Sequence, residues 1–580
     1  MNSFSRFYAM LALCLTVGVT STLNAAAASN PACAYVDPDV TDTSVAGSPF
    51  QNPDEIQSVD GVLTTTLNVA FTDPSTIRIA GCGVRLRSYN GKIVGPTLRV
   101  KPGDVINLTL NNQLPNDSGL EGSEQCHNPE NILGTFPIPK NFNCTNLHTH
   151  GLHVMPERDP VTGNLSDNVF IQIGPTYQNP AQFTIRIPAD HPSGTYWYHP
   201  HLHGSTGVQV ASGMQGAIIV EDLPGRTPAS INAANRNEKI FVLQTLPYDD
   251  HGEINDFLAL GDDRSFVRNR HVLVNGQVAP TITIRPGEVQ RWRFINASFN
   301  RSILLQLEDH DLHEIALDGI YLPQVDTWAN NGPRKRSDAE EWNFSLKSQS
   351  VHTIPGSRSD VLVVGNLNPG RYKLVGTTFI TGRLNPALAA IKQYVIAWVD
   401  VTGEPMRMAL PRDEEMEKLV PYSEIQNDEI SMHQTVDFSV DRPIGGDDGN
   451  IVCDPERDEV PCYPVSFRIN GRVFNPGQPR LLKLNQADAW TLTTKEVNRA
   501  HVFHIHTNSF QTTRIRPNGE EGTIWRDTLF VGYGNPRTFF TRYKDFTGKF
   551  VLHCHILSHE DLGMMEAQQV VDSPKIHNAD

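Results

Sequence analysis

The sequence lacks the features that mark nucleic-acid-binding and membrane-spanning proteins. Acidic residues outnumber basic ones, 64 to 48, and the formal net charge is −16. Nucleic-acid recognition usually requires basic patches, so this balance argues against such a partner. Beyond residue 28 no apolar run approaches the length that crosses a bilayer. We therefore expect neither a nucleic-acid partner nor a membrane span.

The N-terminus has the pattern of a secretory signal peptide. Arg6 precedes a short apolar stretch, which is followed by the small residues Ala25–Ala28. This order of basic, apolar and small residues is typical of a segment that is removed on export. We expect residues 1–28 to be the signal peptide, and the mature protein to reside in the periplasm or the extracellular space.

Cysteine is scarce, with 8 in 580 residues. Cys14 lies in the signal peptide and Cys554 lies among histidines, which leaves six. An even number in an exported chain suits disulfides. Proximity along the chain favours the pairs Cys126–Cys144 and Cys453–Cys462, leaving Cys33–Cys82, although other pairings stay open.

Glycine and proline are plentiful, 43 and 40, which indicates many turns and all-β architecture. A strand, turn and strand unit over residues 94–108 recurs over 273–294 and more weakly over 468–492. Its turn glycine, Gly103, corresponds to Gly287 after 184 residues and to Ala487 after a further 200. Repeats at domain-sized spacing predict three related β-domains.

Changes in composition suggest where the domains begin and end. Residues 224–238 are polar and residues 403–429 are strongly charged, as expected of linkers. The predicted organisation is a signal peptide at 1–28, a first domain at 29–223, a linker at 224–238, a second domain at 239–402, a charged linker at 403–429, a third domain at 430–572 and a tail at 573–580.

The densest group of metal-binding side chains lies near the C-terminus, at His553, Cys554, His555, His559 and Met564. A strand directs successive side chains to opposite faces. His553 and His555 would point one way and Cys554 the other, so one strand could join two metal sites. Cysteine, a weak thioether and two histidines form a blue-copper site. Alternatively, a lone cysteine is often a small buried hydrophobic residue.

Three other histidine pairs share the spacing of His553 and His555. They are His148 with His150, His199 with His201, and His504 with His506. Four pairs supply eight imidazoles, too many for one tetrahedral zinc ion but suitable for three copper ions. His501 lies on the opposite face from His504 and would complete the Cys554 site.

These four clusters resemble the four copper motifs of the multicopper oxidases, a family that includes laccases and bacterial cuprous oxidases. The resemblance covers essentially the whole chain after the signal peptide. It implies an all-β fold of three consecutive cupredoxin-like Greek-key β-barrel domains, with no copper ligand in the middle one. Val502 departs from the family pattern, where proline is frequent.

The resemblance also implies four copper ions and assigns their ligands. The type 2 copper would be held by His148 and His504. The type 3 pair would be held by His150, His199, His201, His506, His553 and His555. The type 1 copper would be held by His501, Cys554, His559 and the axial Met564.

The family's reaction implies roles for two carboxylates. Electrons from a reductant would enter at the type 1 copper and pass through Cys554 to the other three, where four electrons reduce dioxygen to two waters. Glu560 matches a family carboxylate that supplies protons. Asp167 is the candidate acid near the type 2 copper, with Asp159 as the alternative.

The resemblance leaves the reductant open. We expect a laccase-like oxidase of phenolic or aromatic-amine substrates, acting as a monomer. Cuprous oxidases often carry a methionine-rich insertion that binds Cu(I), but here Met406, Met408, Met416 and Met432 are thinly spread. Cu(I) oxidation is therefore the alternative. A non-catalytic cupredoxin-fold binding protein is a remote one, because all twelve ligand positions are filled. An axial Met564 predicts a low to medium type 1 potential.

Overall fold

The computed structural model describes residues 33, 47–116, 126, 139, 141–254, 271–330, 350–383, 391–441 and 466–572. The predicted signal peptide, the tail and the Cys453–Cys462 pair lie outside the described residues. The other two predicted disulfides, Cys33–Cys82 and Cys126–Cys144, are confirmed. Within the described part of the chain, no helix combines the length and apolar character needed to cross a membrane.

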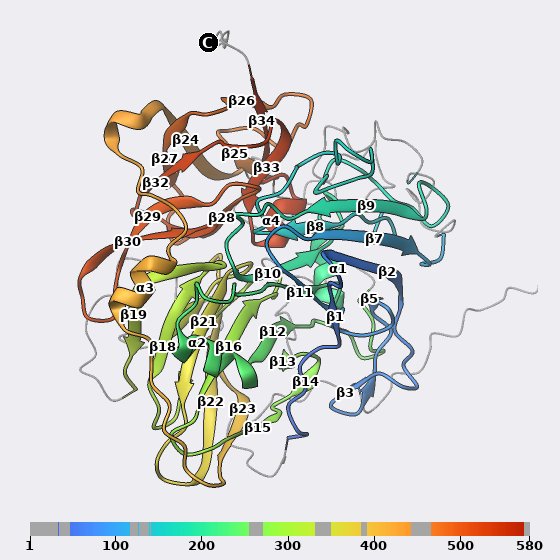
Figure 1. Cartoon of the computed structure of the whole chain (residues 1–580). Helices are drawn as coiled ribbons and strands as arrows, with labels where there is room; N and C mark the ends of the chain where they lie inside the picture. Colours follow the sequence, from blue (N-terminus) through green and yellow to red (C-terminus); the bar gives the residue numbers. More distant parts are fainter. Residues whose placement is uncertain are drawn as a thin grey trace, which may run out of the picture.

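Three consecutive sections of the chain each form two β-sheets (Figure 1). In the first section the sheets have the orders β1-β6-β11-β10-β8 and β5-β2-β7-β9, and β3 and β4 pair separately. These strands are β1 Glu55–Gln57, β2 Val62–Phe71, β3 Arg78–Ile79, β4 Cys82–Gly83, β5 Arg87–Tyr89, β6 Thr97–Val100, β7 Val105–Asn112, β8 His148–His150, β9 Ala181–Arg186, β10 Gly194–His199 and β11 Gly216–Val220.

The second section forms sheets in the orders β14-β13-β12-β16-β21-β18-β19 and β15-β23-β22-β17-β20. Its strands are β12 Lys239–Thr245, β13 Val272–Val274, β14 Gln277–Val278, β15 Thr281–Ile284, β16 Val289–Asn296, β17 Arg301–Leu307, β18 Leu312–Leu317, β19 Ile320–Trp328, β20 Val351–Thr353, β21 Arg358–Val364, β22 Gly370–Ile380 and β23 Lys392–Val401.

The third section forms sheets in the orders β25-β24-β27-β32-β29-β30 and β26-β34-β33-β28-β31. Its strands are β24 Ile430–Asp441, β25 Ser466–Ile469, β26 Arg480–Lys483, β27 Ala487–Thr494, β28 Ala500–Ile505, β29 Phe510–Ile515, β30 Glu521–Arg526, β31 Thr528–Gly532, β32 Arg537–Arg542, β33 Gly548–Cys554 and β34 Met565–Val571. The helices are short: α1 Thr206–Ser212, α2 Ala229–Ala234, α3 Asp413–Met416 and α4 Leu557–Asp561, with 3₁₀ turns η4 Asn235–Asn237, η7 Glu417–Leu419 and η8 Asn427–Glu429.

All three sections repeat one strand topology. One sheet of each contains a parallel pair of strands, which is β2 with β7 in the first section, β12 with β16 in the second and β24 with β27 in the third. The second strand of each pair then has an antiparallel neighbour, β9, β21 and β32 respectively. The other sheet contains the parallel pairs β6 with β11, β15 with β23 and β26 with β34. The prediction of an all-β chain with three cupredoxin domains is confirmed, while the exact domain boundaries stay predictions.

The repeated turn corrects one detail of the sequence interpretation. Gly103 and Gly287 take left-handed conformations, with φ of 93° and 71°, two residues before β7 and β16 begin. Two residues before β27, Asn485 takes the same conformation with φ of 63°. Asn485, and not Ala487, therefore corresponds to the turn glycines, because asparagine tolerates this conformation better than alanine does.

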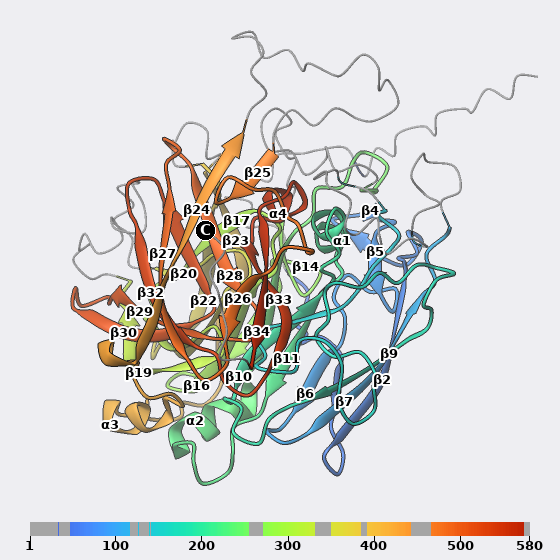
Figure 2. The same cartoon turned by 90° about the horizontal axis from the view of Figure 1, so that it is seen from above.

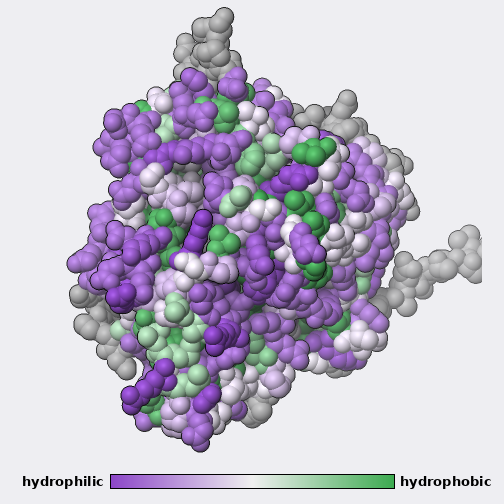
Figure 3. Space-filling view, in the orientation of Figure 1, coloured by the Kyte–Doolittle hydropathy of each residue, from purple (hydrophilic) through white to green (hydrophobic). Residues whose placement is uncertain are grey.

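The three domains pack against one another around a common centre (Figure 1), with the first domain on the right, the second below and the third at the upper left. Each encloses hydrophobic residues between its sheets. Most of the face seen in Figure 3 is hydrophilic, and its hydrophobic residues form small separate patches.

Helices α1 of the first domain and α4 of the third lie side by side (Figure 2). The Asp561 carboxylate at the end of α4 accepts hydrogen bonds from the backbone N–H groups of Gly204, Thr206 and Gly207, at 2.7, 3.2 and 2.7 Å. These donors belong to the start of α1, where helix N–H groups lack intrahelical acceptors. The buried carboxylate therefore fastens the two domains together beside the histidine clusters.

Candidate metal centre

The four histidine pairs occupy corresponding places in the first and third domains. His148 lies opposite His199 on the antiparallel strands β8 and β10, and His504 lies opposite His553 on β28 and β33. The corresponding middle-domain strands, β17 and β22, contain no histidine. The middle domain thus repeats the topology without the metal-binding side chains.

The two histidine-bearing domains face each other with their imidazole rings in reciprocal stacks. His148 stacks on His506 with ring centroids 3.8 Å apart, and His150 stacks on His504 at the same separation. The interplanar angles are 10° and 7°. The first histidine of one pair therefore meets the second histidine of the other, as a pseudo-twofold axis between the domains requires.

The nitrogen atoms of these rings converge in groups that could each hold a metal ion. Those of His201, His506 and His553 lie within 4.8 Å of one another, as do those of His148, His504 and His506 and those of His148, His150 and His199. His201 Nε2 is 3.1 Å from His553 Nε2, and His199 Nε2 is 3.4 Å from His150 Nδ1. The ring of His555 lies against that of His150, with centroids 4.9 Å apart.

Burial keeps these imidazoles in the form that binds metals. It lowers the pKa of His199, His201 and His553 to about 3, so the rings are neutral and can donate a lone pair. Nε2 of His148 and of His504 is buried with no hydrogen-bond partner among the described residues. Buried nitrogen atoms without such partners need another explanation, and copper ligation fits this donor set.

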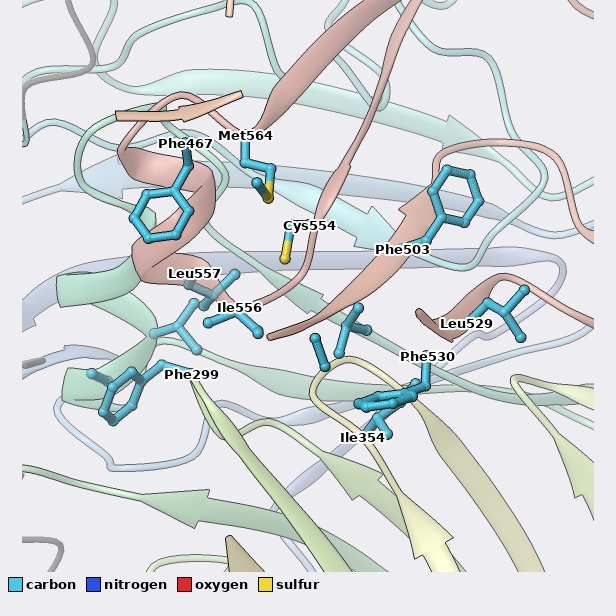
Figure 4. Close-up of a cluster of buried hydrophobic side chains, with 14 of the residues drawn as sticks. Phe299, Ile354, Phe467, Phe503, Leu529, Phe530, Cys554, Ile556, Leu557 and Met564 are labelled. Carbon is cyan, nitrogen blue, oxygen red and sulfur yellow. The ribbon is translucent and has the colours of Figure 1, made fainter. Parts of the chain in front are cut away.

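A second group lies on the other side of β33. Cys554 Sγ is 3.7 Å from His501 Nδ1 and 3.6 Å from His559 Nδ1, and the two nitrogen atoms are 3.3 Å apart. All three side chains are buried. Figure 4 shows the side chain of Met564 extending toward that of Cys554. Two histidines, a cysteine and a weak axial methionine are the donors of a blue-copper site.

Two phenylalanines cover the histidine rings of this second group. Phe438 stacks on His501 with ring centroids 5.0 Å apart, and Phe467 stacks on His559 at 4.0 Å. Both phenylalanines are buried, so they fix the ring planes and exclude water from one face of each. The sequence contained no signal for either, because both lie far along the chain from the histidine they cover.

Alternation along β33 joins the two groups. Cys554 points to the group that it forms with His501 and His559. His553 and His555 point the other way, to the centre formed by the four histidine pairs, called here the eight-histidine centre. This is the arrangement that strand geometry predicted. The two centres are consequently connected by covalent bonds of adjacent residues.

Comparison with known proteins establishes the family. Three profiles described as multicopper oxidase match residues 141–225, 248–329 and 453–574, one in each domain. The chain belongs to the multicopper oxidase family. The histidine clusters of this multicopper oxidase are consistent with type 1, type 2 and type 3 copper sites, while the assignment of individual ligands to individual coppers stays a prediction.

The relatives of this multicopper oxidase have different activities. A multicopper oxidase of Staphylococcus aureus is 24% identical over 491 residues, 82% of either chain. A laccase of Bacillus subtilis is 24% identical over 538 residues, covering 85% of this chain and 91% of its own.

The solved multicopper oxidase of Campylobacter jejuni, a metallo-oxidase, matches with a TM-score of 0.65 at 20% identity, over 93% of this chain and 98% of its own. A laccase of Pediococcus acidilactici matches with a TM-score of 0.64 at 21% identity, over 92% and 95%. These two structural matches concern the fold alone.

Asp167 lies directly behind His148. Its two carboxylate oxygens are 2.9 and 3.0 Å from His148 Nδ1, and it accepts a 2.7 Å hydrogen bond from the Thr149 N–H. Burial raises the pKa of Asp167 to about 7. The alternative, Asp159, instead pairs with Arg186 at 2.7 Å. The geometry thus favours Asp167, whose part in proton transfer stays a prediction.

Glu560 lies behind two other histidines of the eight-histidine centre. Its carboxylate oxygens are 3.1 Å from His553 Nδ1 and 3.5 Å from His201 Nδ1. Burial raises the pKa of Glu560 above its ordinary value. A buried carboxyl group with a raised pKa that contacts two histidines can both orient the rings and supply protons.

Asp527 is a further carboxylate at the centre that no sequence pattern indicated. One of its oxygens is 3.5 Å from His150 Nε2 and 3.6 Å from His504 Nδ1. Its backbone carbonyl lies 2.9 Å from the same His504 nitrogen. Asp527 follows β30 without a neighbouring histidine in sequence, so only the fold brings it here.

We expect Glu560→Gln to slow oxygen reduction roughly a hundredfold, the low end of what a general acid contributes. The amide keeps the side-chain size but supplies no carboxyl proton. Stopped-flow measurement should show that type 1 copper is still reduced at the wild-type rate in the absence of oxygen. Glu566→Gln on β34, whose carboxylate pairs with Arg480, is the control and should behave as wild type. Equal oxygen-reduction rates in both variants would contradict the role of Glu560.

We expect Met564→Leu to raise the type 1 reduction potential, because the weak axial thioether is replaced by an apolar side chain. A redox titration followed by the blue absorption band measures this change. The variant should keep the band, since His501, Cys554 and His559 remain. An unchanged potential would mean that Met564 is not an axial ligand.

Proposed function

We propose that this multicopper oxidase is laccase-like: it couples four one-electron oxidations of phenolic or aromatic-amine substrates to the reduction of dioxygen to two waters. The observation that carries the oxidase chemistry is the covalent connection, through β33, between the Cys554 group and the eight-histidine centre. When bound there, copper ions supply one-electron transfer and the site of dioxygen reduction. The signal-peptide pattern supports our further proposal that the enzyme is exported.

A carboxylate beside His501 supports phenols as substrates. His501 Nδ1 faces Cys554, so Nε2 points away from it, and Glu496 Oε2 lies 4.0 Å from Nε2. The Glu496 side chain is 20% exposed, while its Oε2 is buried beside His501 and its Oε1 accepts a hydrogen bond from the Val440 N–H. A phenol loses one proton with each electron, and we propose that Glu496 accepts that proton as the electron enters through His501. Four phenols thereby provide the four electrons for one dioxygen.

The methionines of the charged linker favour this reading over Cu(I) oxidation. Met416 in α3 is fully buried in a cluster with Val289 of the middle domain. Met408 Sδ accepts a 3.3 Å hydrogen bond from the Val289 N–H. Both side chains therefore pack against the middle domain, as ordinary linker methionines do. Because both a laccase and a metallo-oxidase occur among the related proteins, the substrate needs a direct test.

The direct test is oxygen uptake by the copper-loaded enzyme with a methoxyphenol or with Cu(I) at equal concentrations. We expect rapid uptake with the phenol and slow uptake with Cu(I). The reverse result would make Cu(I) oxidation the function. No uptake with either substrate, at full copper loading, would contradict the oxidase proposal as a whole.

We expect Glu496→Gln to lower kcat/KM for phenols roughly a hundredfold, as loss of a general base does. Ferrocyanide, which releases no proton on oxidation, should be oxidised at the wild-type rate. The exposed Glu521 on β30 provides the control, Glu521→Gln, which should affect neither donor. If Glu496→Gln slowed both donors equally, the carboxylate would act on the type 1 site and not on the phenol proton.

A further inference from the structure

Arg358, at the start of β21 in the middle domain, is buried where all three domains meet. Its Nε donates a 3.2 Å hydrogen bond to the carbonyl of Thr195 in the first domain, and its Nη2 donates one of 2.9 Å to the carbonyl of Asp318 in its own. Nη1 and Nη2 also reach the two carboxylate oxygens of Asp527 in the third domain, at 2.7 and 2.5 Å. The guanidinium group is thus held in one orientation by three domains.

The middle domain holds the Asp527 segment from a second side. The Asp318 carboxylate accepts hydrogen bonds from the backbone N–H groups of Asp527 and Thr528, at 3.2 and 3.1 Å, and from the Thr528 hydroxyl at 2.8 Å. Arg358 fixes the Asp527 side chain while Asp318 fixes its backbone. Two middle-domain residues therefore determine where the Asp527 carboxylate lies.

Asp527 in turn lies behind histidines from two different domains. It approaches Nε2 of His150, whose Nδ1 faces His199, and Nδ1 of His504, whose Nε2 is buried without a hydrogen-bond partner in the described structure. In His504 Asp527 lies beside the nitrogen atom opposite the unpartnered Nε2, and in His150 it lies beside Nε2, opposite the nitrogen atom that faces His199. Such contacts fix ring orientation and raise ligand basicity.

Two glycines leave the room that this arrangement needs. Gly151, which follows His150, has φ of +88°, and a Cβ there would lie 2.3 Å from Arg358 Nη2 and 2.7 Å from Asp527 Oδ2. Gly356 has φ of +83°, and a Cβ there would lie 2.8 Å from the His555 ring. The middle domain therefore approaches the eight-histidine centre closely at two points, Arg358 beside Gly151 and Gly356 beside His555. A side chain at either glycine would collide there.

We propose that Arg358 and Asp527 are positioning residues for the eight-histidine centre, which would hold three copper ions. The middle domain, which supplies no ligand, would thereby set the orientation of His150 and His504. The proposal rests on the copper centre of the proposed function. A buried carboxylate without its cationic partner is strongly unfavourable. Loss of Arg358 would consequently let the Asp527 side chain move, and both imidazoles would lose their fixed neighbour.

The test compares Arg358→Lys, Asp527→Asn and Gly151→Ala in the full-length, copper-loaded enzyme. Lysine keeps the charge but cannot make the paired bonds to Asp527. Alanine at position 151 displaces the ion pair without removing a polar group. The matched control is Arg291→Lys, because Arg291 forms an equally buried middle-domain ion pair, 2.5 Å from Asp360, that contacts no histidine of the centre.

The measurements are the type 2 copper EPR signal, copper retention against a chelator, and the blue type 1 absorption as an internal reference. In the three variants at the centre we expect altered type 2 hyperfine splitting and copper retention weakened about tenfold or more, as loss of partners behind metal ligands causes. Type 1 absorption per chain should stay at the wild-type value. Arg291→Lys should leave all three measurements unchanged.

Unchanged type 2 spectra and copper retention in both Arg358→Lys and Asp527→Asn would overturn the proposal. A parallel loss of type 1 and type 2 copper, seen also in Arg291→Lys, would overturn it by showing that any buried ion pair has the same effect. These readouts are independent of turnover. A wild-type enzyme that consumes no oxygen would contradict the proposed function, whereas an active enzyme with unaltered variant spectra would contradict only the positioning role.

Discussion

Eight imidazoles buried between two domains are the constraint on which the rest of the structure depends. Each is neutral because burial lowers its pKa, and each domain supplies only half of them. The reciprocal stacks of His148 on His506 and His150 on His504 exist only when the first and third domains are docked. Asp561 fastens α4 to the start of α1 close by. Domain docking and assembly of the metal centre are therefore one event.

The middle domain has the same topology as its neighbours but another task. It has no histidine on the corresponding strands β17 and β22, and it approaches the centre instead through Arg358 of β21 and through Gly356, which lies against His555. Its buried charges are compensated within and between domains, as for Arg291 with Asp360 and Asp222. A buried charge that loses its partner is costly, so these pairs permit one docked arrangement.

Strand geometry explains how the two groups of metal-binding side chains are joined. Because side chains alternate along β33, Cys554 and its two neighbours face opposite directions over a few ångströms of backbone. The hydrophobic residues around Cys554 in Figure 4, among them Phe503, Ile556 and Leu557, separate its group from water. The Cys554 group, with Glu496 4.0 Å from His501, is thus held apart from the eight histidines enclosed between the first and third domains.

The sequence by itself determined the features that depend on local spacing. The histidine pairs, the alternation at Cys554 and the three-domain repeat are read from short segments and their spacing. The Cys126–Cys144 disulfide followed from proximity along the chain, and Cys33–Cys82 was the pair that remained. The turn at Asn485 was misplaced onto Ala487, because asparagine can replace glycine at a left-handed position. Only the tertiary structure chose Asp167 over Asp159 and brought Asp527, Arg358, Glu496 and the stacking phenylalanines to the metal centres. Carboxylates, arginines and phenylalanines occur throughout the chain, and their roles here arise from contacts across domains or across long stretches of sequence, which leave no periodic or local signal.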